Sequence, residues 1–348
     1  MNPRRVTLKD IARKLGVSHT TVAMSLRNDE RITPGRREQV KRAAAEMGYE
    51  PDPFLAGLAA YRRERVGRSF QGVIAWVNHW NPPARLRSFR EFEAYWNGAV
   101  AAGKQHGYLV EEIVWPKDCT AKALERILIA RGIRGLLIPP HHELLDWGDF
   151  DWSRFSVIRF GLSVPAPDTN LITSDHFRAM LLAVTKIHEH GYRRIGLIVD
   201  GEFNDRLGGS YHGGFRWAQE KLKLKPALPP LLVCKQQFSD TPTKAANALR
   251  RWLARHRPDA ILTSETYIPG ILRKLGYQIP RDLAVAGTSI CDIPVDAGIN
   301  QQSETIGRLA VETLIKQLHV NERGQPAHPT RILVESTWND GQSLPRRS

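Results

Sequence analysis

The chain has 348 residues and a formal net charge of +14, with 50 Lys and Arg against 36 Asp and Glu. This length exceeds one compact core and is typical of a small domain joined to a larger one. The three cysteines are odd in number and far apart, which excludes a disulfide framework, so we expect free, buried thiols. We find no apolar signal core and no apolar run of membrane-spanning length, and therefore expect a soluble, cytoplasmic protein.

The positive charge is placed unevenly along the chain. Residues 1–65 hold 14 Lys and Arg and 8 Asp and Glu, a net charge of +6. A basic segment suits contacts with DNA phosphates. Basic surfaces that only contact water are common in proteins. The charge therefore indicates DNA binding only together with the helices that carry it.

Residues 6–51 have the pattern of three short helices. Thr7 is placed to cap the first helix, and Gly16 is placed to turn the chain after it. Ser18 then caps a second helix. The apolar residues of the first helix recur at i, i+3, i+4 and i+7: Leu8, Ile11, Ala12 and Leu15.

The second helix has an outer side suited to DNA. With Val22 and Leu26 facing inward, four side chains remain outside: His19, Thr20, Met24 and Arg27. Thr33-Pro34 opens a third helix, which Gly48 closes. A helix, a glycine turn and a second helix form the helix-turn-helix arrangement, in which the start of the second helix reads base edges. The alternative is a small helical bundle without a ligand.

This segment resembles the DNA-binding domain of the lactose-repressor (LacI/GalR) family of bacterial transcription regulators. The matching residues are Thr7-Leu8-Lys9-Asp10-Ile11-Ala12, Gly16-Val17-Ser18, Thr21-Val22, Leu26 and Gly48-Tyr49-Glu50-Pro51. The chain departs from the usual family pattern at Ala23, where the family has Ser, and at Arg27, where it has Asn.

The resemblance implies that the first two helices contact DNA, with Thr7 among the contacts. Three residues of the second helix would read bases: His19, Thr20 and Met24. Three would position the helix on phosphates: Ser18, Thr21 and Arg27.

Residues 52–69 are expected to join residues 1–51 to the rest of the chain. Asp52-Pro53 is a helix start, but the apolar run after it is short, and a helix of two turns is marginal alone. In the family this stretch is a hinge helix that orders on operator DNA, where a Leu matching Leu58 wedges into the minor groove. The alternative is an ordinary linker.

Residues 70–340 alternate short apolar runs with helical stretches, which predicts parallel sheets with helices on both faces. The predicted strands are 72–77, 108–114, 135–138, 156–160, 194–199, 231–234, 260–262, 284–286 and 331–335. This number of strands suggests two sheets with a cleft between their carboxyl ends. We therefore predict an all-α helix-turn-helix domain followed by a two-lobed α/β domain.

The resemblance extends through this region and implies a fold like that of type I periplasmic binding proteins, with three crossovers between the lobes. Lobe 1 would comprise residues 70–165 and 298–325. Lobe 2 would comprise 166–297 and 326–340, and 341–348 would form a tail.

The expected cleft departs from the family at three places, one of which is Ser264-Glu265 in place of a typical Asn-Asp pair. Tyr211 stands where many members carry an effector-gripping Arg, and Ser289 stands where they carry an Asp. The remaining residues are aromatic and polar, which suits the faces and hydroxyls of a sugar. The candidate effector contacts are Trp76, His79, Phe89, His141, Asp205, Arg206, Tyr211, Glu265 and Ser289. The alternative for Trp76 and Phe89 is a place in the core.

Other chemistry finds little support in the sequence. His188 and His190 diverge on a helix, and no Cys, His and carboxylate cluster has metal-ligand spacing. We find no phosphate-binding glycine loop and no nucleophile with its base. The sequence therefore predicts no metal, no cofactor and no enzymatic activity.

These patterns together predict a homodimeric regulator, most simply a repressor, that binds palindromic operator DNA and responds to a carbohydrate-related effector. Two alternatives remain. In the first, the regulator responds to a protein partner in place of the small molecule, or has no effector at all. In the second, which fits the helix-turn-helix segment less well, the chain is a cytoplasmic solute-binding protein.

Overall fold

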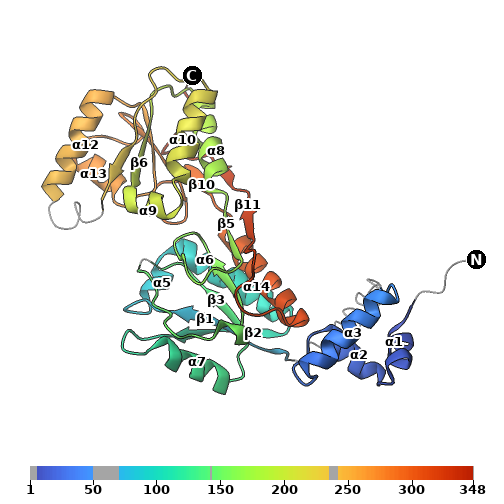
Figure 1. Cartoon of the computed structure of the whole chain (residues 1–348). Coiled ribbons are helices and arrows are strands. Elements are labelled where there is room, and N and C mark those ends of the chain that lie inside the picture. The colour runs from blue at the N-terminus through green and yellow to red at the C-terminus, as the bar shows by residue number, and fades with distance from the viewer. Residues whose placement is uncertain (1–5, 50–69, 142, 235–241, 348) are drawn as a thin grey trace, which may run out of the picture.

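The computed structural model describes residues 6–49, 70–141, 143–234 and 242–347 (Figure 1). A helical unit at the N-terminus is followed by two α/β lobes, one built on each of two six-stranded sheets. This is the predicted fold class. Leu58 and the rest of the proposed hinge lie outside the described residues.

Three helices form the N-terminal unit: α1 (Leu8–Leu15), α2 (His19–Leu26) and α3 (Pro34–Glu46). Gly16 makes the turn between the first two with φ 63°, a left-handed conformation that glycine adopts without strain. Their apolar sides close on a small core of six buried residues: Ile11, Ala12, Val22, Val40, Ala43 and Ala44. The predicted helix starts and inward faces are confirmed.

Lobe 1 contains a sheet in the order β11-β5-β4-β3-β1-β2, in which all pairs are parallel. Its strands are β1 (Gly72–Asn78), β2 (Tyr108–Val114), β3 (Gly135–Ile138), β4 (Ser156–Phe160), β5 (Leu171–Ser174) and β11 (Arg331–Val334). Short helical turns follow β1 and precede β4: α5 (Arg85–Ser88) and η1 (Trp152–Arg154). Both faces of this sheet are covered by helices, as the alternation of strands and helices predicted.

One face of this sheet packs against α6 (Arg90–Gln105) and α14 (Ser303–Val320), and the other packs against α7 (Ala121–Ala130). Helices α6 and α14 approach closely through two glycines. A Cβ at Gly98 would lie 2.0 Å from the carbonyl oxygen of Glu304, and a Cβ at Gly307 would lie 2.0 Å from that of Tyr95. The backbones of α6 and α14 are therefore in close contact at these two positions.

Lobe 2 contains a sheet in the order β12-β10-β9-β8-β6-β7, in which only β12 pairs antiparallel. Its strands are β6 (Ile195–Asp200), β7 (Leu231–Val233), β8 (Ala260–Thr263), β9 (Ala284–Gly287), β10 (Gly298–Asn300) and β12 (Thr337–Asn339). One face carries α8 (His176–Glu189) and α10 (Ser210–Lys221), and the other carries α12 (Pro242–His256) and α13 (Ile268–Lys274). Helix α9 (Gly201–Arg206) begins where β6 ends.

The chain crosses between the lobes later than we predicted near residues 165, 298 and 326. Strand β5 still belongs to lobe 1, β10 still belongs to lobe 2, and the strand predicted at 331–335 is β11 of lobe 1. Strands β5, β10 and β12 have only three or four residues each and lack the apolar run of a longer strand. They form because neighbouring strands supply hydrogen bonds, which the local pattern does not show.

The C-terminal residues pack into lobe 2 and are not the separate tail that we expected. Leu344 is fully buried in its core, and the carboxylate of Asp296 accepts hydrogen bonds from the N–H groups of Gln342 and Ser343, each at 2.8 Å. The three cysteines are free, as predicted, but they are partly exposed where we expected burial. In the described part of the chain, no helix is long and apolar enough to cross a bilayer.

Candidate DNA-reading face and interlobe site

The start of α2 is held by a hydrogen-bonded cap. The Ser18 Oγ accepts a hydrogen bond from the backbone N–H of Thr21 at 3.0 Å and lies 2.8 Å from the Thr21 Oγ1. The Ser18 side chain thus satisfies one of the free N–H groups at the helix start. This cap fixes the direction in which the next side chains of α2 point.

Most of the predicted DNA contacts lie on the surface of the N-terminal unit. Ser18, His19, Thr20 and Arg27 are exposed, and Thr21 and Met24 are half-buried. The guanidinium of Arg27 donates a 3.1 Å hydrogen bond to the carbonyl of Ala23, one turn earlier, which holds it along the helix. Thr7 is exposed, and its hydroxyl donates to the carboxylate of Asp10 at 2.6 Å. The structure thus leaves the outer side of α2 open.

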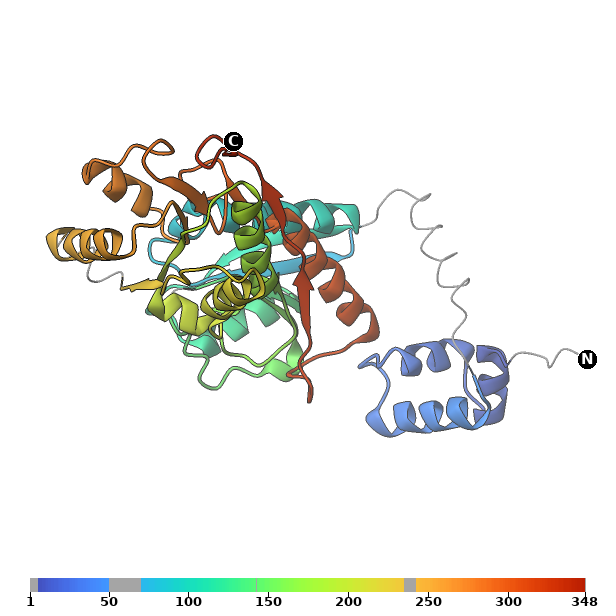
Figure 2. The same cartoon turned by 90° about the horizontal axis from the view of Figure 1, so that it is seen from above.

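The N-terminal unit contacts lobe 1 near the end of α14 (Figure 2). Glu30 forms ion pairs with Arg323 and, at 3.3 Å, with Arg134. Burial favours the neutral acid, but the two guanidinium groups hold the pKa of the Glu30 carboxyl below its usual value. These ion pairs therefore hold the loop after α2 against lobe 1.

Three of the predicted effector residues meet across the carboxyl edges of the sheets. The backbone N–H of His79 donates to the Nε2 of buried His141 at 3.0 Å, while the Nδ1 of His141 lies 2.8 Å from the carbonyl of Pro139. The His141 ring is therefore neutral, with its proton on Nδ1. From lobe 2, the guanidinium of Arg206 reaches the carbonyl of His141 at 3.5 Å. These contacts link the end of β3 in lobe 1 to α9 in lobe 2.

The two predicted aromatic contacts are placed differently. Trp76 is fully buried in the core of lobe 1, with ring centroids 5.0 Å from Phe160 and 5.5 Å from Trp96. Phe89 is half-buried at the start of α6, where its ring lies 5.5 Å from that of Trp80. Trp76 thus takes the core place that we had considered as its alternative, and Phe89 lies near the surface between the lobes.

Glu265 and Asp205 do not lie in equivalent surroundings. Glu265 is buried, and its carboxylate accepts hydrogen bonds from the Ser264 hydroxyl at 2.8 Å and the Asp200 N–H at 3.1 Å. The Glu265 carboxylate can be buried because these hydrogen-bond donors within lobe 2 satisfy it. Asp205 is exposed on α9.

Tyr211 and Ser289 lie beside residues that the sequence reasoning missed. The carboxyl of Glu91, on α6 of lobe 1, is hydrogen-bonded to Ser289 and accepts a 3.0 Å bond from the hydroxyl of Tyr95. The buried Tyr211 hydroxyl is hydrogen-bonded to Thr288 and accepts from Gln301 at 3.3 Å.

An available signal for Glu91 was its place in the sequence. It is an acid in the first turn of the helix that follows β1, at the carboxyl edge of a parallel sheet, where ligands bind in such folds.

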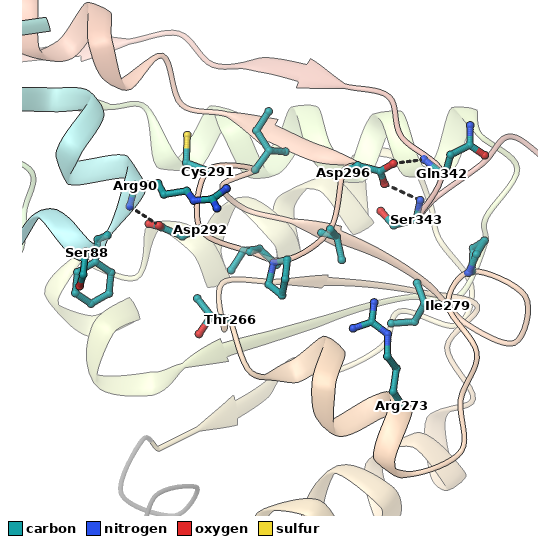
Figure 3. A pocket seen from close by; sticks show the side chains of 16 residues that line it. Ser88, Arg90, Thr266, Arg273, Ile279, Cys291, Asp292, Asp296, Gln342 and Ser343 are labelled. Carbon is teal, nitrogen blue, oxygen red and sulfur yellow. Dashed lines mark hydrogen bonds between the residues drawn. The ribbon is translucent and has the colours of Figure 1, made fainter. Parts of the chain in front are cut away.

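An open hollow of about 770 Å³ lies at the outer side of this junction (Figure 3). Ser88, Phe89 and Arg90 line it from lobe 1, and the loop 290–296 lines it from lobe 2. The carboxylate of Asp292 accepts a 2.7 Å hydrogen bond from the backbone N–H of Arg90. Phe89 is the one predicted effector residue that lines this hollow, so the hollow and the predicted contacts adjoin at α6.

Two parts of the chain match models of known families. Residues 7–52 match the bacterial regulatory proteins of the lacI family, and residues 184–344 match the periplasmic binding protein-like domain. The HTH-type transcriptional repressor CytR of Escherichia coli is 26% identical over 330 residues, which cover 90% of this chain and 89% of CytR.

Solved structures share the fold over almost the whole chain. A complex of the transcriptional regulator CelR with cellobiose aligns with a TM-score of 0.57 at 21% identity, covering 97% of this chain and 100% of that one. The lac repressor dimer bound to operator and the anti-inducer ONPF aligns with a TM-score of 0.55 at 17% identity, covering 98% and 100%. The helix-turn-helix unit is thus similar to the lacI family of bacterial regulatory proteins, and residues 184–344 of the two-lobed domain are similar to the periplasmic binding protein-like domain.

Proposed function

We propose that this chain represses transcription by binding operator DNA in a sequence-specific way, and that a small molecule between the lobes sets its operator affinity. The observation that carries the proposal is the capped helix α2, which presents His19 and Thr20 to solvent at the start of a helix-turn-helix recognition helix. The similarity to CytR, named a transcriptional repressor, supports it. The chain acts as a regulator and not as an enzyme.

The proposed assembly is a cytoplasmic homodimer on a palindromic operator. One α2 enters the major groove of each half-site, and the half-sites lie about one helical turn apart. The lac repressor of similar fold is a dimer on its operator, which supports this assembly. Leu58 is proposed to wedge into the minor groove at the centre of the operator.

The effector is proposed to bind where His79, His141 and Arg206 meet and where Tyr211 and Ser289 face α6. CelR binds cellobiose in its solved complex, which supports a carbohydrate-related ligand here. A ligand that prefers one arrangement of the lobes shifts the population toward it, and thereby changes operator affinity. A protein partner in place of the small molecule is the alternative.

Selection of binding sites from a random duplex pool tests the proposal. The purified full-length chain is expected to enrich a palindrome with a fixed centre, either alone or when metabolites are added. A Thr20→Ala variant is expected to weaken binding to that palindrome while retaining non-specific binding. No enrichment under either condition would contradict the proposed function.

A further inference from the structure

Six residues from the two lobes form a polar group that we call the interlobe cluster. Glu91 and Tyr95 come from α6 of lobe 1. Four residues come from lobe 2: Tyr211, Ser289, Asp292 and Gln301. The contacts of Glu91 with Ser289 and of Arg90 with Asp292 join the two sides.

The interlobe cluster holds two carboxyls that are satisfied by hydrogen bonds and not by ion pairs. Glu91 is hydrogen-bonded by Tyr95 at 3.0 Å and by Ser289, and Asp292 accepts from the backbone N–H groups of Arg90 and Glu91. Within the described residues, neither carboxyl forms an ion pair with a Lys, Arg or His. Two acids thus lie near one another, and Arg90, which is exposed and acts electrostatically on Asp292, is the cation beside them.

A buried acceptor beside these acids also lacks a partner. Gln301 is only 3% exposed, and its Nε2 donates to the Thr288 carbonyl at 3.0 Å and to the Tyr211 hydroxyl at 3.3 Å. Its Oε1 has no partner among the described residues. The Tyr211 hydroxyl in turn lies close enough to Glu91 for the two groups to interact electrostatically. The unpaired Oε1 therefore belongs to the same polar group as Glu91.

No nearby histidine adds a second positive charge to the interlobe cluster. His176 is 8% exposed, and its ring lies 5.3 Å from that of Tyr211. Burial lowers the pKa of His176 to about 4, although Asp175 acts in the opposite direction. His176 is therefore neutral near pH 7. The interlobe cluster offers carboxylate and amide acceptors in excess of donors.

We propose that the interlobe cluster binds a protonated amine of the effector and that Glu91 is the residue that recognises it. A primary ammonium group carries three N–H donors and a positive charge. It can donate to Glu91 and to the free Oε1 of Gln301 while its charge offsets the repulsion between Glu91 and Asp292. A hydroxyl group supplies one donor and no charge. This inference rests on the proposed function, since it names the ligand class of the same interlobe site.

The protonation of Glu91 gives the proposal a pH signature. Burial and the nearby Asp292 raise the pKa of Glu91 to about 7, while the hydrogen bonds from Ser289 and Tyr95 act in the opposite direction. The other titratable groups near it are Tyr211 on α10 and Cys291 on the loop, and Arg90 is exposed beside Asp292. If only the ionised form of Glu91 binds the ammonium group, the fraction of the protein that can bind it rises roughly tenfold from pH 6 to pH 8.

The test compares amines with neutral isosteres on the purified full-length chain. The probes are D-glucamine against D-sorbitol, and cyclohexylamine against cyclohexanol, at matched millimolar concentrations. We expect the amines to raise Tm and the neutral isosteres to leave it unchanged. Calorimetric titration should show affinity for the amines rising roughly tenfold between pH 6 and pH 8. These amines keep their proton over this range, so the pH dependence reports the protein.

A matched pair of variants on α6 identifies the carboxyl. Glu91→Gln keeps an acceptor for the Tyr95 hydroxyl but removes the charge, and is expected to lose at least roughly tenfold in amine affinity together with the pH dependence. Glu93→Gln removes an exposed acid from the same first turn and is expected to bind amines like the wild type. Tm without a probe reports whether each variant is folded, and Asp292→Asn provides a second loss of charge in the same cluster.

Equal stabilisation by amines and neutral isosteres, unchanged amine binding in folded Glu91→Gln, or no response to either amine would each overturn the inference. Operator binding separates this result from the proposed function. Failure of the amine test with a selected palindrome in hand rejects only the ligand class. Amine binding without any selected operator rejects only the DNA-binding role.

Discussion

The carboxylate of Asp292 in lobe 2 accepts a 2.7 Å hydrogen bond from the backbone N–H of Arg90 in lobe 1. Helix α6 has no side-chain cap of its own, because Phe89 occupies the N-cap position. Asp292 therefore satisfies free N–H groups of a helix that belongs to the opposite lobe. The favourable interaction of a carboxylate with a helix N-terminus becomes a contact that holds the lobes together.

Asp292→Ala is expected to loosen this contact. Loss of a helix cap costs about 1 kcal/mol, so exchange of the Arg90 and Glu91 amide hydrogens should accelerate roughly fivefold. Hydrogen exchange resolved by mass spectrometry measures this change. Asp205→Ala, which removes an exposed acid from α9 of the same lobe, serves as the control. Equal exchange at the start of α6 in both variants would show that Asp292 does not hold the lobes.

His176 is expected to make the chain less stable in mild acid. Burial lowers its pKa from 6.5 to about 4, so below pH 6.5 the unfolded chain binds a proton that the folded chain does not. The free energy of unfolding should therefore fall by about 3 kcal/mol between pH 6.5 and pH 4 from this residue alone. Urea unfolding at several pH values measures the slope.

Two variants separate this effect from the other titrating groups. His176→Asn removes the buried imidazole and should lose less stability than the wild type as the pH falls through this range. His328→Asn removes an exposed imidazole and should follow the wild type. A His176→Asn profile parallel to that of the wild type would assign the acid sensitivity to other residues.

Much of the fold was predictable from the sequence because its signals are local. The Ser18 cap, the helix start at Thr33-Pro34 and the left-handed turn at Gly16 depend on neighbouring residues. The structure confirms all three, although the Thr33 side chain makes no capping hydrogen bond. Strands β5, β10 and β12 were missed, since they pair with strands distant in sequence: β5 with β11, and β10 with β12. Because these strands were missed, the predicted crossings between the lobes were placed too early in the chain.

The interlobe site was less predictable because it depends on which side chains face across two separate lobes. Ser289 was named from its place after β9, but its partner Glu91 lies about 200 residues earlier in the chain. Trp76 has the composition of a ligand contact, yet the packing of α6 and α14 buries it completely. The aromatic pattern alone does not separate these two roles.

Gly98→Ala is expected to destabilise lobe 1. The added Cβ would lie 2.0 Å from the Glu304 carbonyl oxygen, so α6 and α14 would have to separate. Overpacking of this kind costs about 1–3 kcal/mol. Gly270→Ala on α13 is the matched control, since nothing lies within 4 Å of its Cβ and alanine favours the helix. Thermal unfolding should show a lower Tm for the first variant and an unchanged or higher Tm for the second.

The cap on α2 should matter to the stability of the N-terminal unit and, through it, to DNA binding. Ser18→Ala removes the oxygen that accepts from the Thr21 N–H and is expected to cost about 1 kcal/mol. Ser18→Asn restores a capping oxygen and should recover most of this loss. Because the N-terminal unit has its own small core, exchange of its amide hydrogens should report the change more directly than Tm of the whole chain.

His19→Ala and Thr20→Ala should change sequence preference more than total DNA affinity. Their exposed side chains lie at the start of α2, where a recognition helix meets base edges, so each loss should cost about 1–3 kcal/mol on the selected palindrome. Affinity for unrelated duplex should stay within a factor of two or so, and its salt dependence should not change, because neither side chain neutralises a phosphate. Gln39→Ala, on the exposed side of α3, is the control and should leave both affinities unchanged. Equal losses on the palindrome and on unrelated duplex, measured by fluorescence anisotropy at two salt concentrations, would show that these residues position the helix and do not read the sequence.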